Sequence, residues 1–150
     1  MNSDDQALLA EVKRLFSVQP LAALATHNHG QPYGSLVAFV ATPDLRCLLF
    51  ATNRATRKFA NLRTDGRVSL LIDNRQNAVD DFRSAMAVTA LGTATEVAAD
   101  ARAAMLQLYL ERHPQLAAFV QAPACALLGV RIAQYTVVRQ FQDVRDLRFD

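Results

Sequence analysis

The sequence has no tryptophan and little cysteine, proline or glycine: among 150 residues there are two cysteines, five prolines and five glycines. Cys47 and Cys125 are too far apart for the paired spacing of a zinc or redox site, and two cysteines make no disulfide framework. No apolar run approaches the roughly 18 residues of a membrane-spanning helix, and the acidic N-terminus lacks the apolar segment of a secretory signal. We therefore expect a cytoplasmic protein with reduced thiols and no membrane partner.

The remaining composition is that of an ordinary globular domain. Hydrophobic residues make up 51% and charged residues 20% of the chain, which argues against disorder. A chain of this length fits one domain and buries roughly 70% of the surface that it exposes when unfolded. The formal net charge of +2 is too small to indicate nucleic-acid binding by itself. We expect a single domain over residues 1–150.

Most of the chain has the pattern of short strands. Segments rich in Val, Leu, Thr and Phe, bounded by turn residues, predict strands at residues 21–26, 33–42, 46–52, 67–73 and 86–97. The turn Asn28-His29-Gly30 predicts a hairpin between the first two strands. Further strands are expected within residues 126–141, and the charged residues 143–146 are expected to lie in a solvated loop.

Helical periodicity is limited to three places, at residues 4–17, 54–64 and 98–121, the last one broken at Pro114. The polar segment 74–84 is expected to be a loop. The strands follow one another without strict strand–helix alternation, which makes a doubly wound sheet unfavourable. We predict a mainly β fold with inserted helices, in which six to seven antiparallel strands close into a split barrel.

Positive charge is concentrated between residues 54 and 67. This segment carries one acid, Asp65, and five basic residues: Arg54, Arg57, Lys58, Arg63 and Arg67. Its local charge is +4, so the rest of the chain carries −2. The position of these charges is therefore more informative than their sum.

Thr56 stands where the cap of the short helix is expected, because its hydroxyl can accept a hydrogen bond from a backbone N–H two or three residues later. Arg57 and Lys58 then occupy the first turn, where the positive end of the helix dipole disfavours cations. An anion bound between them would relieve this repulsion, since free N–H groups and basic side chains together form a phosphate site. A solvated basic helix without a ligand is the alternative that these residues leave open.

Residues 50–74, FATNRATRKFANLRTDGRVSLLIDN, resemble the signature of the pyridoxamine 5′-phosphate oxidase-like, FMN-binding split-barrel family. In that family a strand ending in Thr-Asn leads to a Ser/Thr-Arg-Lys helix start and then to an Arg-Val-Ser-Leu strand. Here these parts are residues 52–53, 56–58 and 67–70. Upstream, LAALATHNHGQPYGSLVAFVA resembles the first hairpin of the family, including its Gly-x-Pro turn. The resemblance covers residues 18–97 well and continues more weakly to Phe141.

The resemblance implies a homodimer with FMN in a groove at the subunit interface. Carried over residue by residue, it assigns the FMN phosphate to Arg57 and Lys58, with Thr56 close by. The remaining cofactor-binding positions lie on the third and second strands: Ala51, Thr52, Ser35, Leu36, Val37 and Ala38. An apolar second strand is also typical of a simple core strand, and on that interpretation Leu36, Val37 and Phe39 are buried.

Three departures separate the chain from the oxidase itself. The second strand SLVAFVA lacks the arginine and lysine of the oxidase, Met86-Ala87-Val88 lacks its glutamine, and DVRDLRFD lacks its C-terminal Arg-x-His motif. We therefore expect an FMN-binding oxidoreductase acting on a small molecule other than pyridoxamine phosphate, with no catalytic side chain identified. Related branches bind a deazaflavin or haem, so a non-enzymatic module binding flavin, deazaflavin or haem is the alternative.

The histidines give weaker signals. His27 and His29 have the spacing at which two strand residues share a face and chelate a metal, but no carboxylate or cysteine follows at metal-site spacing. No metal is expected, and an exposed turn or a role at the flavin edge remain open. His113 precedes Pro114 and is expected to complement the helix dipole. Nucleic-acid binding through residues 54–67 is not expected, because only Phe59 interleaves the basic residues.

Overall fold

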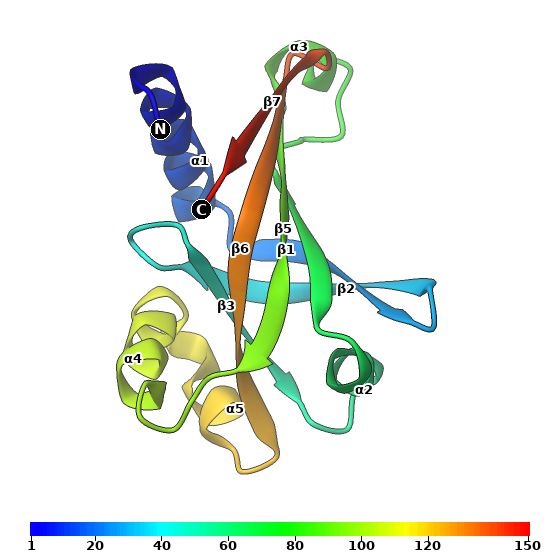
Figure 1. The fold of residues 1–150 in the computed structure, drawn as a ribbon, viewed down its shortest axis with the longest axis vertical. Coiled ribbons are helices and arrows are strands. Elements are labelled where there is room, and N and C mark those ends of the chain that lie inside the picture. Colours follow the sequence, from blue (N-terminus) through cyan, green and yellow to red (C-terminus); the bar gives the residue numbers. More distant parts are fainter.

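The computed structural model describes residues 1–150 and contains seven strands (Figure 1). The N-terminal half contains α1 (Ser3–Val18), β1 (Leu21–Asn28), β2 (Gln31–Ala41), β3 (Cys47–Asn53), α2 (Arg57–Thr64) and β4 (Arg67–Asp73). The C-terminal half contains α3 (Asp81–Ser84), β5 (Met86–Glu96), α4 (Arg102–Arg112), the 3-10 turn η1 (Pro114–Leu116), α5 (Ala117–Gln121), β6 (Cys125–Arg139) and β7 (Asp143–Arg148). The short α3 lies in the segment expected to be a loop.

The sheet closes into an antiparallel barrel. The strand order is β3-β2-β1-β4-β5-β6-β7, and β3 also pairs with β6, which closes a ring of six strands and leaves β7 as an extension. The mainly β split barrel with inserted helices is therefore confirmed. Closure of the ring reduces the exposed strand edges that so apolar a sheet would otherwise present.

The last two strands differ from the prediction. One continuous strand, β6, pairs with β3 through its first half and with β7 through its second half. The expected loop at 143–146 is wrong, because these residues form β7. This strand lies at an edge and buries Leu147 while most of its other residues face solvent. Its high charge content therefore concealed its strand character from sequence reasoning.

The first hairpin is confirmed, and its turn explains the residues found there. His29 and Gly30 both have positive φ, at 48° and 84°, and Asn28 pairs with Gln31 across them. Two consecutive left-handed residues form the hairpin turn whose twist matches that of the strands. Glycine adopts this conformation without steric cost.

Two clusters of buried side chains form the core. A cluster of 26 residues fills the barrel and extends beneath α1, with Phe16 packed edge-on to Phe39 at a ring distance of 5.5 Å. A second cluster of six lies outside the barrel wall, under α4 and α5: Leu49, Ala51, Tyr109, Val120, Cys125 and Leu127. Alternate residues of β3 enter the two clusters, so this strand is covered on both faces. That burial accounts for its unbroken apolar sequence.

The helices are fixed to the barrel by polar contacts as well as by packing. An asparagine–aspartate capping box, Asn2 with Asp5, begins α1. Its C-terminal turn has no basic residue of its own, but Arg112 of α4 donates to the carbonyls of Ser17 and Gln19. A cation at this end complements the negative pole of the helix dipole. No helix combines the length and apolarity needed to cross a membrane.

Candidate functional site

The start of α2 has the predicted cap. The Thr56 hydroxyl accepts a hydrogen bond from the Phe59 N–H at 3.3 Å and donates to the Asn53 carbonyl at 2.9 Å. It also lies 2.9 Å from the hydroxyl of Thr52, which is 2% exposed at the end of β3. These bonds fix the first turn of α2 against the third strand. Thr52 and Thr56 are thereby brought together as the resemblance required.

The basic cluster is only partly neutralised within the chain. Arg54 pairs with Glu96, and Arg67 pairs with Asp65 at 2.7 Å. Neither Arg57 nor Lys58 makes an ion pair. The guanidinium of Arg57 instead lies over the Tyr33 ring of β2, 5.4 Å from its centroid. The first turn of α2 therefore presents two cations without counter-charges, one exposed and one half-buried.

The second strand alternates between two environments. Val37 is 5% exposed inside the barrel, whereas Leu36 is 69% exposed on the outer surface. The expected burial of Leu36 is wrong, because no helix of the chain covers the outer face at this place. Ser35, on the inner side with Val37, has a buried hydroxyl oxygen without a hydrogen-bond partner. It is the only buried side-chain polar atom of the chain left unpaired.

The backbone of β2 is partly free beside the cluster. Its ladder with β3 covers only Phe39–Ala41 against Leu48–Phe50. From Ala38 back to Gln31 the strand pairs with β1 alone. The stretch containing Ser35, Leu36, Val37 and Ala38 therefore has one unpaired edge, and main-chain donors and acceptors on that edge can bind a polar ring. Ala51, by contrast, directs its side chain into the cluster under α4 and α5.

Tyr109 of α4 and His113, the residue that follows this helix, support the second strand. The Tyr109 hydroxyl donates to the Ala38 carbonyl at 3.3 Å, and His113 Nε2 lies 2.7 Å from the Phe39 carbonyl. Their spacing of four residues places both on one helix face, which is the only signal by which the sequence could have indicated them. His113 lies at the predicted helix end, as the C-cap of α4, and is 2% exposed; its expected role at the helix dipole stays a prediction. Burial raises the pKa of Tyr109 to about 12.

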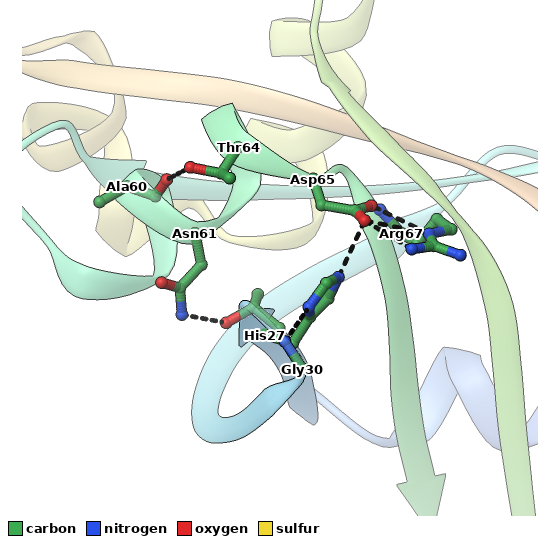
Figure 2. Close-up of polar contacts among 8 residues, drawn as sticks. His27, Gly30, Ala60, Asn61, Thr64, Asp65 and Arg67 are labelled. Carbon is green, nitrogen blue, oxygen red and sulfur yellow. Dashed lines mark hydrogen bonds and ion pairs between the residues drawn. The ribbon is translucent and has the colours of Figure 1, made fainter.

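His27 belongs to a separate polar cluster at the other end of α2 (Figure 2). Its Nδ1 accepts from the Gly30 N–H at 3.2 Å, and its Nε2 lies 3.0 Å from the Asp65 carboxylate. Hydrogen bonds from the Arg67 guanidinium hold the pKa of Asp65 well below its usual range. The buried Asn61 amide also donates to Thr26 at 3.0 Å, joining α2 to β1. No group of three or more His, Cys, Asp and Glu side chains is arranged to hold a metal ion.

Apolar side chains gather on the outer surface of β1, β2, β4 and β5, a surface that we call the outer face. Ala23 of β1 lies opposite Leu36 on one side and Leu71 on the other, and Ala25 lies opposite Ser69. The large members are partly or mostly exposed: Leu21 at 51%, Leu36 at 69%, Leu71 at 38% and Leu91 at 41%. The outer face is thus a mixed surface of leucines and small residues that the chain itself leaves uncovered.

These features agree with the comparison of the whole sequence with known families. The pyridoxamine 5′-phosphate oxidase family matches residues 8–139. The chain belongs to this family. A pyridoxamine 5′-phosphate oxidase homolog of Schizosaccharomyces pombe is 31% identical over an alignment of length 87, which covers 50% of this chain and 46% of that protein. The chain therefore spans about half the length of this curated relative.

Solved structures of the same fold include proteins that bind different cofactors. A haem-binding protein of Mycobacterium smegmatis superposes with a TM-score of 0.81 and 19% identity, over 93% of this chain and 57% of that one. A FAD-binding protein of Mesorhizobium loti superposes with a TM-score of 0.66 and 18% identity, over 86% and 90%. At these identities the likeness concerns the fold alone.

Proposed function

We propose that the protein is an FMN-binding flavoprotein and that the first turn of α2 holds the FMN phosphate. The observation that carries this proposal is the pair Arg57 and Lys58, which stand without counter-charges at the positive end of a helix dipole. Each cation there costs about 0.3–1 kcal/mol at an exposed site. A phosphate removes this cost. It also accepts hydrogen bonds from the first N–H groups of the helix, which have no partner within the helix.

The neighbouring strand fits the remainder of the cofactor. An unpaired buried hydroxyl costs about 1–3 kcal/mol, and a polar group of the ribityl chain would give Ser35 Oγ a partner. The free edge of β2 offers main-chain groups to the isoalloxazine ring, with Tyr33 and Arg57 beside it. Apolar surroundings with a few placed polar groups are typical of sites for flat cofactors.

We further propose that the protein is a homodimer that buries the outer face. Leucines exposed at these fractions are costly to leave in water when they lie together, and the small residues between them allow close approach of a second sheet. A second copy of this chain has the same surface to offer, as a two-fold interface requires. The family resemblance implies that the FMN groove lies at such an interface.

FMN, when bound, supplies hydride transfer, so we propose an oxidoreductase that acts on a small molecule. The chain would bind and orient the cofactor through the start of α2 and the edge of β2, while α4 keeps that strand in place through Tyr109 and His113. The three departures from the oxidase noted above argue against pyridoxamine phosphate as the substrate. The free thiols of Cys47 and Cys125 support a reducing, cytoplasmic location.

Haem is the second candidate, because a haem-binding protein shares the fold. Its iron requires an axial ligand, most often a histidine. His27 has both ring nitrogens engaged, and His113 is buried against the Phe39 carbonyl. Only His29, in the hairpin turn, has a ring free of such contacts. The residues present therefore favour the flavin.

The experiment has two titrations of cofactor-free protein. In one, FMN is added and flavin fluorescence is monitored; in the other, haem is added and the Soret band is monitored. We expect FMN to bind in the wild type, and to bind at least about a hundredfold more weakly in Arg57→Gln/Lys58→Gln, since two charge-assisted contacts are lost at about 1.5–3 kcal/mol each. Arg131→Gln/Arg148→Gln removes the same charge from exposed positions outside the site and should bind FMN normally. A protein that binds haem but no FMN would contradict the proposal.

A further inference from the structure

A second pocket lies at the end of the barrel away from α2. It has a volume of about 400 Å³ and is bounded by α1, by the segment leading into β5 and by the end of β6. In Figure 1, α3 and the turn between β6 and β7 lie at this end, whereas α2 lies near the opposite end. The pocket is therefore separate from the proposed flavin site, and nothing in that proposal uses it.

Three arginines converge on this pocket from different elements: Arg14 of α1, Arg83 of α3 and Arg139 of β6. Arg139 is neutralised, since it pairs with Glu11 at 2.8 Å and with Asp143 at 3.0 Å. The side chains of Arg14 and Arg83 form neither an ion pair nor a hydrogen bond within the chain. Glu11 is the only carboxylate that lines the pocket, so its walls carry an excess of positive charge.

The rest of the lining is apolar, with a few neutral polar groups. Leu15, Val18, Ala85 and Met86 supply the hydrophobic surface. Asn74 uses its carbonyl oxygen to accept from the Met86 N–H at 2.7 Å, which leaves its amide N–H groups available as donors. Guanidinium groups bind oxyanions through paired hydrogen bonds, and pockets of this volume accept small organic molecules.

The rim of the pocket has unusual backbone geometry. Gln140 and Phe141 both have left-handed φ values, 51° and 66°, although neither is glycine. Phe141 packs edge-on against Phe82 with ring centroids 5.4 Å apart, and both rings are more than half exposed. The two left-handed residues form the hairpin turn between β6 and β7, as His29 and Gly30 do in the first hairpin. This contact joins the turn after β6 to α3, next to Gln140 and Arg83 in the pocket wall.

From this arrangement we infer that the pocket binds an amphipathic organic anion, with an aromatic or aliphatic body and a carboxylate, sulfonate or phosphate group. The anionic group lies between Arg14 and Arg83, and the apolar body lies on Leu15 and Met86. Glu11 and Asp143 balance the charge of Arg139, so Arg14 and Arg83 supply the net positive charge and the site favours ligands of low negative charge. This inference is independent of flavin binding.

The test uses two probes that share an aromatic body: anilinonaphthalene sulfonate, which is an anion, and N-phenylnaphthylamine, which lacks the sulfonate. Binding is measured by calorimetry on the full chain saturated with FMN, or on the cofactor-free chain if FMN does not bind. We expect the sulfonate to bind at one site and the neutral probe to bind at least about tenfold more weakly. Equal affinity for the two probes would overturn the inference.

Variants locate the site. Arg14→Gln/Arg83→Gln should weaken sulfonate binding about tenfold for each arginine removed, whereas Arg131→Gln/Arg148→Gln, which removes equal charge elsewhere, should leave it unchanged. Glu11→Gln removes the lining carboxylate and leaves Arg139 paired with Asp143 alone, so it should tighten binding several-fold, a gain that damage to the fold would not produce. Equal losses in both double variants, or weaker binding in Glu11→Gln, would overturn the proposed site.

Discussion

Self-association through the outer face depends most on Leu36, which is the most exposed of its leucines and lies opposite Ala23. Complete burial of a leucine side chain contributes about 1.5–3 kcal/mol. Because Leu36 is 69% exposed, a partner would bury about two-thirds of that value, or about 1–2 kcal/mol. A two-fold interface contains the residue twice, so the two copies together stabilise the dimer by about 2–4 kcal/mol.

The variant Leu36→Asp should therefore raise the dimer dissociation constant by about thirty- to a thousandfold, and burial of two carboxylates would add to the loss. Sedimentation equilibrium at several protein concentrations measures this constant. Val79→Asp is the matched control. Val79 is 83% exposed between β4 and α3, so the substitution adds the same charge at a position outside the outer face. A wild type that stays monomeric, or a Leu36→Asp protein that dimerises as well as the wild type, would refute the reasoning.

Three further predictions concern stability. Tyr135 donates to the buried Leu45 carbonyl at 2.6 Å, so Tyr135→Phe should lower the free energy of unfolding in urea by about 1–3 kcal/mol; a change below about 0.5 kcal/mol would contradict this. Gly92 lies too close to a β6 carbonyl for any Cβ, whereas a Cβ on Gly34 meets no atom, so Gly92→Ala should lower the melting temperature clearly more than Gly34→Ala. Burial raises the pKa of Tyr109 to about 12, while a tyrosine in the unfolded chain titrates near 10. The unfolded state therefore loses this proton first, stability falls by up to about 1.4 kcal/mol per pH unit between these values, and Tyr109→Phe should remove this contribution from the measured slope.

Local signals predicted the parts of the fold that depend on near neighbours. The start of α2 follows from one side chain, Thr56, and the N–H groups next to it in sequence, so the cap could be predicted without knowledge of the tertiary structure. The first hairpin likewise follows from the two residues, His29 and Gly30, that accept positive φ. The apolar sequence of β2 predicted a strand, but it did not distinguish the strand's two faces, since Leu36 and Val37 were both expected to be buried and only Val37 is.

Contacts between distant segments could not be predicted in this way. Arg54 forms an ion pair with Glu96, a residue distant from it in the sequence. This pair neutralises one cation of the basic cluster and leaves Arg57 and Lys58 without counter-charges. Leu36 is 69% exposed because no helix of the chain packs over it, a consequence of topology rather than of its own neighbours. The pocket between α1 and α3 gathers Arg14 and Arg83 from segments about 70 residues apart, and no spacing in the sequence marks it.

The central claim is that the first turn of α2 recognises the FMN phosphate, and the most direct measurement compares the affinity for FMN with that for riboflavin, which lacks the phosphate. The account predicts that the wild type binds FMN at least about a hundredfold more tightly. In Arg57→Gln/Lys58→Gln this ratio should fall toward one while the affinity for riboflavin is retained. A wild type that binds both flavins equally, or a variant that keeps the full preference for FMN, would contradict the claim.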